Sequence, residues 1–338
     1  MPWIGPQPRP GRVSIKIRNR KSKIPRRNAI FRDVMAFSST IVGLGESLFD
    51  VFPDRQVLGG APLNAAVHAH QLAAGRGGGA VMVSRVGQDE LGQRVIAELN
   101  ERGVGTEDLQ TDPDHKTGIV HVRVDEHGQP DYEISPDVAW DWLQWDPDLE
   151  ALAHRCDAVT FSSLAQRHSQ SRSSIQRFLS EASGAVRLFD LTIRQSYYDR
   201  DLLRRSCALS SVVKANLEEL ELLRRLLGLD GTDVDDVARS LRERFGLDLV
   251  VVTRGAEGTV LYTPRDRFEG SRVQYPPAPD ADSVGAGDAA TAAIAVGMVF
   301  GLAWPRIVDL ANHAGAYVAS VPGGTPTLAQ EILDMAKS

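Results

Sequence analysis

The chain has 338 residues, of which 42% are hydrophobic and 24% charged, and its formal net charge is −6. These values are ordinary for a soluble globular protein, and the length allows one large α/β domain or two average ones. No apolar run reaches about 18 residues, so no membrane span is expected. Cys156 and Cys207 could form at most one disulfide, so we expect a protein of the reducing cytoplasm.

The N-terminal end of the chain differs from the rest in charge. Residues 1–34 contain ten lysines and arginines against one acid, Asp33. Such an arm could bind nucleic acid or a membrane surface. Its prolines and lack of periodicity favour disorder, and it has no signal-peptide core. We expect a disordered, dispensable arm at 1–36, with Met35 as an alternative start, followed by one domain at 37–338. Neither nucleic acid nor a membrane is expected as a partner.

Strands and helices alternate along most of this domain. The predicted strands are 39–44, 80–86, 157–162, 185–191, 212–216 and 249–253. The predicted helices are 64–74, 91–102, 171–183, 217–227, 232–245, a helix ending near Gly301, and 305–321. This rhythm predicts an α/β fold with a mostly parallel central sheet and helices on both faces.

Two segments depart from that rhythm. Residues 117–134 alternate as a hairpin with its turn at 126–129, and we expect them to form a separate flap. Residues 45–53 read as a continuation of the first strand, which would place Glu46 and Asp50 on one face.

Residues 282–288, Asp-Ser-Val-Gly-Ala-Gly-Asp, are the working centre of the chain. A glycine turn that opens a helix presents unpaired N–H groups and the positive end of the helix dipole, which together make an anion site. Asp288 in the first turn could accept a hydroxyl proton while a phosphoryl group is held beside it. In the alternative interpretation, Gly285 and Gly287 only make a turn, and Asp288 caps a buried helix.

Other polar residues follow predicted strands, at the edge where open α/β sheets bind ligands. Gly59 and Gly60 let the backbone approach a ligand, and Asn64 offers both a donor and an acceptor. The alternative there is an ordinary loop with an asparagine cap. Asn216 and Glu219 follow another strand in the same way.

Three motifs, in this order, resemble the ribokinase-like, or PfkB, family of carbohydrate kinases. Residues 59–66 look like its N-terminal sugar-binding segment, 216–219 match its N-x-x-E motif, and 282–289 are similar to its C-terminal signature. The resemblance runs from about Ser39 to Leu328. It implies a ribokinase-like fold with a small β lid, from about 48–60 and 117–134, and ATP-dependent phosphorylation of a sugar hydroxyl. In many relatives the lid also forms a homodimer contact.

The resemblance also implies a role for each candidate residue. Asp288 would be the catalytic base. The anion hole would be formed by the N–H groups of Gly285, Ala286 and Gly287. The sugar hydroxyls would be bound by Asp50, Gly60 and Asn64. The nucleotide and its phosphates would be bound by Asn216, Glu219, Thr253, Gly255, Gly258 and Asn312. Glu219 would act indirectly on Mg²⁺, and Asp282, with carbonyls near 318–324, would bind K⁺.

The substrate is predicted from the stretch around residues 45–62, which looks most like bacterial fructokinases, so fructose is the first choice. Ribose, a nucleoside or 2-keto-3-deoxygluconate are alternatives, as is a non-catalytic sugar-binding regulator. Two departures bear on this choice. Thr192 replaces the asparagine of a D-x-N-x-R segment, and residues 135–139 lack the usual lid residues.

Overall fold

The computed structural model describes residues 37–124 and 130–337. The predicted arm at 1–36 and the predicted hairpin turn at 126–129 lie outside the described residues. Within the described part of the chain, no helix is long and apolar enough to cross a membrane.

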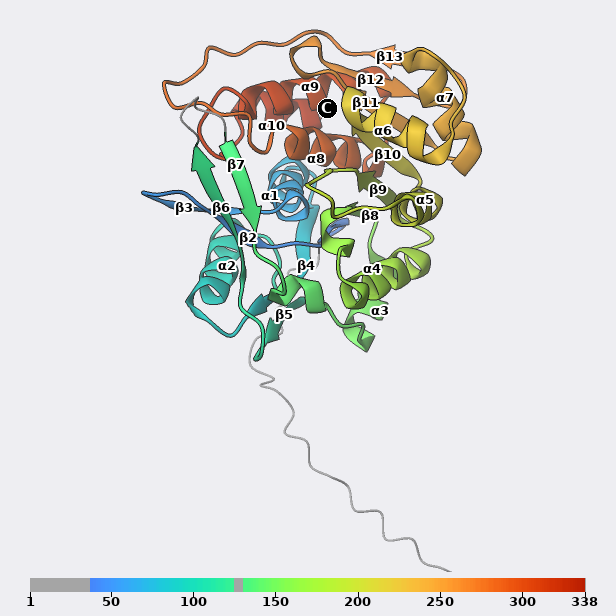
Figure 1. Cartoon of the computed structure of the whole chain (residues 1–338). Coiled ribbons are helices and arrows are strands. Elements are labelled where there is room, and N and C mark those ends of the chain that lie inside the picture. The colour runs from blue at the N-terminus through green and yellow to red at the C-terminus, as the bar shows by residue number, and fades with distance from the viewer. Residues whose placement is uncertain (1–36, 125–129, 338) are drawn as a thin grey trace, which may run out of the picture. The chain divides into compact units, whose positions relative to one another are not determined.

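A nine-stranded sheet forms the centre of the domain (Figure 1), in the order β13-β12-β11-β10-β9-β8-β1-β4-β5. Its strands are β1 (Thr40–Leu44), β4 (Gly79–Gly87), β5 (Leu109–Asp112), β8 (Ala158–Ser162), β9 (Val186–Asp190), β10 (Val212–Asn216), β11 (Leu249–Thr253), β12 (Thr259–Tyr262) and β13 (Arg267–Glu269). All neighbours pair in parallel except β11–β12 and β12–β13.

Helices cover both faces of this sheet, which confirms the predicted fold class. One core contains side chains of α1 (Ala61–Ala74), α2 (Glu90–Glu101), α8 (Ala286–Val299), α9 (Trp304–Val318) and α10 (Gln330–Lys337). The other contains side chains of α3 (Pro147–Arg155), α4 (Ser169–Glu181), α5 (Arg200–Leu209), α6 (Leu217–Leu227) and α7 (Val234–Phe245). In β11, Leu249 and Val251 face the first core, whereas Val250 and Val252 face the second. A continuous apolar strand therefore serves both layers.

A second sheet of four strands has the order β3-β2-β6-β7. It contains β2 (Leu48–Val51), β3 (Gln56–Gly59), β6 (Gly118–Val124) and β7 (Pro130–Ile134). The prediction that residues 45–53 continue the first strand is wrong, because β1 ends at Leu44 and β2 belongs to the small sheet. Gly45, with φ of 148°, separates the two strands. An alternating pattern shows that a segment is extended, but it does not identify the sheet in which the segment pairs.

The direction of winding reverses beside β1. The chain builds β4 and β5 on one side of β1, then returns to place β8 and the later strands on the other side. Open α/β sheets bind ligands in the crevice at the carboxyl ends of the strands that flank such a reversal. This rule locates the site at the ends of β1 and β8.

Candidate active site

α8 begins at the glycine turn that the sequence singled out. Gly285 is the N-cap with φ of 76°, and Ala286, Gly287 and Asp288 form the first turn. A Cβ on Gly285 would lie 2.1 Å from the carbonyl oxygen of Gly324, so only glycine fits both the conformation and the space. Among the described residues, no side chain caps this helix, which excludes the interpretation of Asp288 as a cap. The first turn points its N–H groups at the helix start, where an anion can bind, although the Ala286 N–H also donates to the Ser283 carbonyl at 3.3 Å.

α1 begins in the same way and brings Asn64 to Asp288. Gly60 is its N-cap with φ of 116°, and Pro62 fits the first turn. Because the helix starts at Ala61, Asn64 lies inside it, and the alternative of an asparagine cap is wrong. Asn64 Nδ2 donates to Asp288 Oδ2 at 2.9 Å. Its Oδ1 is buried and has no hydrogen-bond partner among the described residues.

The Asp288 carboxyl lies in a mixed electrostatic environment. Burial, followed by the negative charge of Asp190, raises the pKa of Asp288 to about 6. The Asn64 hydrogen bond and the charges of Lys214 and Arg194 act in the opposite direction. A carboxyl with this pKa is ionised at neutral pH and is a stronger base than an exposed aspartate.

Glu46 lies at the winding reversal, directly after β1, and is only 1% exposed. Its Oε2 accepts from Ser162 Oγ at 2.8 Å, and its Oε1 accepts from the Ala61 N–H at 3.3 Å. Burial raises the pKa of Glu46 to about 7, and the nearby Asp288 charge adds to this effect. Glu46 thus joins the end of β8 to the start of α1.

A buried ion pair that the sequence analysis missed lies under the turn of α8. Lys214 Nζ donates to both carboxylate oxygens of Asp190, at 2.9 and 2.8 Å, and Thr291 Oγ1 donates to the same carboxylate at 2.6 Å. Burial alone would lower the pKa of Lys214, but the charge and hydrogen bonds of Asp190, together with the charges of Glu219 and Asp288, outweigh it and keep the pKa above its usual value. A lysine inside the otherwise apolar segment 212–215 is the signal that could have identified this cluster.

Asp50 lies in β2 of the small sheet, and its charge is coupled to the same site. Burial raises the pKa of Asp50 to about 6, while the positive charge of Arg194 opposes this rise and Asp282 adds to it. Because Arg194 also acts on Asp288, the 190–194 segment lies within electrostatic range of both carboxylates. The charge of Arg194 therefore acts on both the predicted sugar-binding residue and the predicted base.

Asn216 and Glu219 form a reciprocal cap at the start of α6. Asn216 Oδ1 accepts from the Glu219 N–H at 2.8 Å, and Glu219 Oε2 accepts from the Asn216 N–H at 2.9 Å. Glu219 Oε1 also accepts from the Ile193 N–H at 3.0 Å. The N-x-x-E motif thus has a structural task, which is to join the loop after β9 to the end of β10.

The residues predicted to line the nucleotide lie in two places: at the ends of β10 and β11 with the turn that follows, and on α9. Thr253 pairs with Asn216 at the ends of β11 and β10, and Gly255 and Gly258 form the turn between β11 and β12, with φ of 57° and 84°. Asn312 on α9 lies beneath this turn and is 7% exposed, and its Nδ2 donates to the Ser271 carbonyl at 2.8 Å. A Cβ on Gly258 would lie 2.9 Å from Asn312 Nδ2, so Asn312 packs against the turn while it binds Ser271.

Asp282 connects two loops beside the start of α8. Its Oδ1 accepts from the Val284 N–H at 3.0 Å, and its Oδ2 accepts from the Gly323 N–H at 3.3 Å. These bonds bring together the two segments from which the resemblance builds a potassium site.

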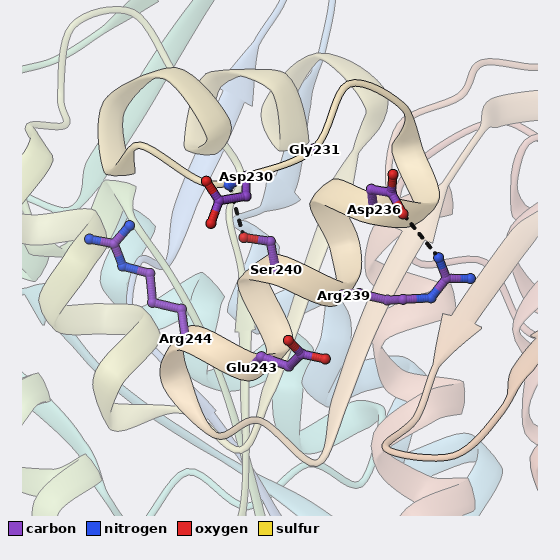
Figure 2. A pocket seen from close by; sticks show the side chains of 7 residues that line it. All are labelled: Asp230, Gly231, Asp236, Arg239, Ser240, Glu243 and Arg244. Carbon is purple, nitrogen blue, oxygen red and sulfur yellow. Dashed lines mark hydrogen bonds and ion pairs between the residues drawn. The ribbon is translucent and has the colours of Figure 1, made fainter.

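A surface hollow beside α7 has a volume of about 800 Å³, and none of the candidate residues lines it. Figure 2 shows the side chains that do. The hollow is lined by Asp230, Gly231, Asp236, Arg239, Ser240, Glu243 and Arg244. Arg239 pairs with Asp236 at 3.3 Å, and Ser240 accepts from the Asp230 N–H at 2.9 Å. Arg244 donates to the carbonyls of Leu227 and Gly228, and Glu243 pairs with Arg242. Both arginines that line the hollow therefore already have partners within the protein.

A carboxylate held beside an open helix N-terminus, at the winding reversal of a parallel sheet, is the arrangement of a phosphotransferase acting on a hydroxyl. Comparison with known proteins supports the same class of enzyme. The profile of the pfkB family carbohydrate kinases matches residues 30–331. The chain belongs to this family, and it is an ATP-dependent sugar kinase.

Named relatives are similar over nearly their whole length. The fructokinase of Escherichia coli is 30% identical over 312 residues, covering 86% of this chain and 96% of the relative. Fructokinase-1 of Oryza sativa subsp. japonica is 27% identical over 322 residues, covering 87% and 96%. The structure of the Vibrio cholerae O395 fructokinase bound to fructose, ADP and calcium ion superposes with a TM-score of 0.72, at 26% identity, covering 89% and 99%.

Proposed function

We propose that this kinase phosphorylates fructose, with ATP as phosphoryl donor, Mg²⁺ as the divalent ion and Asp288 as the base. The observation that carries the proposal is the pairing of Asn64 with Asp288 at the open start of α8. The fructokinases among its relatives support the choice of sugar.

In this proposal, Asp288 orients the sugar hydroxyl and accepts its proton as the oxygen attacks the terminal phosphoryl group. The N–H groups at the start of α8, with the helix dipole, stabilise negative charge that develops on the transferred group. Asn64 holds the Asp288 carboxylate in position through its Nδ2.

The sugar would bind between the small sheet and α1. The unpaired Oδ1 of Asn64 is an acceptor for a sugar hydroxyl, because a buried acceptor without a partner costs free energy until a donor reaches it. Asp50 would accept from further hydroxyls, beside the backbone of Gly60. The small sheet would act as a lid over this pocket. It would also form the contact of a homodimer, and gel filtration would test whether the protein is a dimer.

The donor set fits a nucleotide-bound Mg²⁺. No group of three or more His, Cys, Asp or Glu side chains that could hold a metal gathers among the described residues. Mg²⁺ commonly keeps several waters and binds through phosphates and one or two carboxylates. Glu219 would be that carboxylate, acting through water, and the bound ion would neutralise phosphate charge. K⁺ would lie at Asp282, so faster turnover in K⁺ than in Li⁺ is expected.

The test is a screen of sugars by coupled ADP release with Mg²⁺. Turnover of fructose well above that of ribose, nucleosides and 2-keto-3-deoxygluconate supports the proposal. Strong turnover of one of the others would change the substrate and leave the phosphoryl-transfer site in place. Binding of a sugar without any ADP release would instead support the regulator.

A further inference from the structure

One face of α1 carries three polar side chains at helical spacing, Asn64, His68 and Gln71. Asn64 reaches Asp288, whereas the other two reach the segment 324–328 that follows α9. The motif resemblance accounts for Asn64 only. His68 is fully buried, lies one turn from Asn64, and has no part in the chemistry proposed above.

His68 is a neutral donor. Its Nε2 lies 3.0 Å from the carbonyl oxygen of Gly324. Because a carbonyl oxygen only accepts hydrogen bonds, the proton must be on Nε2. Burial lowers the pKa of His68 to about 4, so the ring stays uncharged at neutral pH.

Gly324 lies where α1 meets the glycine turn at the start of α8. A Cβ built on Gly324 would lie 3.2 Å from Asn64 Nδ2 and 3.3 Å from Val284 Cγ1. On the other side, the Gly324 carbonyl oxygen lies 2.1 Å from the position that a Cβ on Gly285 would take. A shift of Gly324 would therefore displace both the N-cap of α8 and the Asn64 amide that holds Asp288.

We propose that His68 is a positioning residue for phosphoryl transfer: by holding the Gly324 carbonyl, it keeps the start of α8 and Asn64 aligned for reaction. This inference rests on the proposed roles of Asn64 and Asp288. The hydrogen bond spans 256 residues of sequence and joins α1 to the loop that packs on Gly285.

A simpler interpretation is that His68 only tethers the C-terminal segment to the domain. Gln71 provides the matched control, since it is on the same helix face and binds the same segment. Its Nε2 donates to the Pro326 carbonyl at 3.2 Å, and its Oε1 accepts from the Leu328 N–H at 2.8 Å. These contacts lie beyond Gly324, away from Gly285.

The experiment compares His68→Leu, His68→Gln and Gln71→Leu in the full-length protein, using a sugar that the wild type phosphorylates. We expect His68→Leu to lower kcat by at least about tenfold, because a displacement of about 1 Å can cost about a hundredfold. The KM for ATP should change by less than about threefold. Gln71→Leu should lower the melting temperature and keep a kcat near that of the wild type. His68→Gln keeps an N–H donor and should recover part of the kcat.

If His68→Leu does not fold, Gly324→Ala tests the same contact between α1, Gly324 and the start of α8 from the Gly324 side. Its backbone has no positive φ, so alanine is allowed, and the added methyl group presses on Asn64 and Val284. We expect a lower kcat there too. Equal kcat losses in His68→Leu and Gln71→Leu, or a wild-type kcat in Gly324→Ala, would overturn the proposal. A near-normal kcat in Asp288→Asn would instead remove the proposed base, which is a separate result from the comparison of His68 with Gln71.

Discussion

α1 and α8 begin differently from the helices on the opposite face of the sheet. α3, α5, α6 and α7 each have an Asp or Asn at the N-cap whose side chain accepts a backbone N–H of the first turn. α1 and α8 have Gly60 and Gly285 there, both with positive φ, and neither glycine has a side chain that could cap its helix. An Asp or Asn cap satisfies an N–H group of its own helix, whereas a glycine start leaves these groups to a ligand or to another part of the chain, as the Ala61 N–H donates to Glu46 Oε1 in α1.

The two sets of helices also differ in burial. α1 and α8 are rich in alanine and buried over most of their length, whereas the side chains of α7 divide into a buried and an exposed face. Tight packing fixes the two glycine starts relative to each other, and the Asn64–Asp288 bond joins them. Capping therefore stabilises one set of helices, and packing positions the other set for chemistry.

The largest expected effect is the loss of the base. Asp288→Asn keeps the shape and the place of the side chain but cannot accept the hydroxyl proton. We expect kcat to fall by roughly a hundredfold to ten-thousandfold, with sugar binding retained. Steady-state kinetics with calorimetric sugar titration measures both. A variant with near-normal kcat would show that the open start of α8 works without this carboxylate.

The next largest effect should come from closing the glycine start of α8. Gly285→Ala adds a methyl group where the Gly324 carbonyl oxygen lies 2.1 Å away, so the turn must move. We expect about a hundredfold loss of kcat. Gly246→Ala is the control, because Gly246 has φ of 64° and no atom within 4 Å of its Cβ position. It should only destabilise the fold, by about 1–2 kcal/mol. Similar kcat values in the two variants would contradict a special role for the α8 start.

The sequence predicted the sheet and the residues of the motifs, because both depend on local pattern. Strands such as 249–253 and the glycine start before Asp288 are visible within a few residues. The short strands β3, β5 and β13 and the helices α3, α5 and α10 were not predicted, since edge strands of three or four residues show little alternation and α5 carries many charges.

Partners distant in sequence explain what was missed at the site. The bonds of Glu46 to Ser162 and of His68 to Gly324 join residues 116 and 256 positions apart. A single histidine or glutamate in the sequence does not reveal such a partner. Only the packing of α1 against α8 and the order of the strands bring these pairs together.

The pH dependence should reveal the coupling of α1 to α8. Because only ionised Asp288 can act as the base and its pKa is raised to about 6, kcat should fall as the pH drops through about 6. Asn64→Ala removes a hydrogen bond that lowers this pKa, so its acidic limb should move to higher pH at saturating sugar. Glu46, Asp190, Lys214 and Arg194 also face Asp288 and remain in both proteins. If kcat falls at the same pH in the wild type and in Asn64→Ala, then Asn64 does not act on the base.

The smallest effect tests α6, a helix of the capped set whose cap is also a candidate site residue. α6 has a side-chain cap like α7, but its cap, Asn216, is also a candidate nucleotide residue. Asn216→Ala and Asp233→Ala should each destabilise the fold by about 1 kcal/mol, measured by denaturant unfolding. Asp233→Ala should leave the kinetics unchanged. Asn216→Ala should also raise the KM for ATP by roughly tenfold, the equivalent of one hydrogen bond worth about 1.4 kcal/mol. If the KM for ATP is the same in the two variants, Asn216 serves α6 only as a cap. The ATP phosphates are then bound from the glycine start of α8 without Asn216.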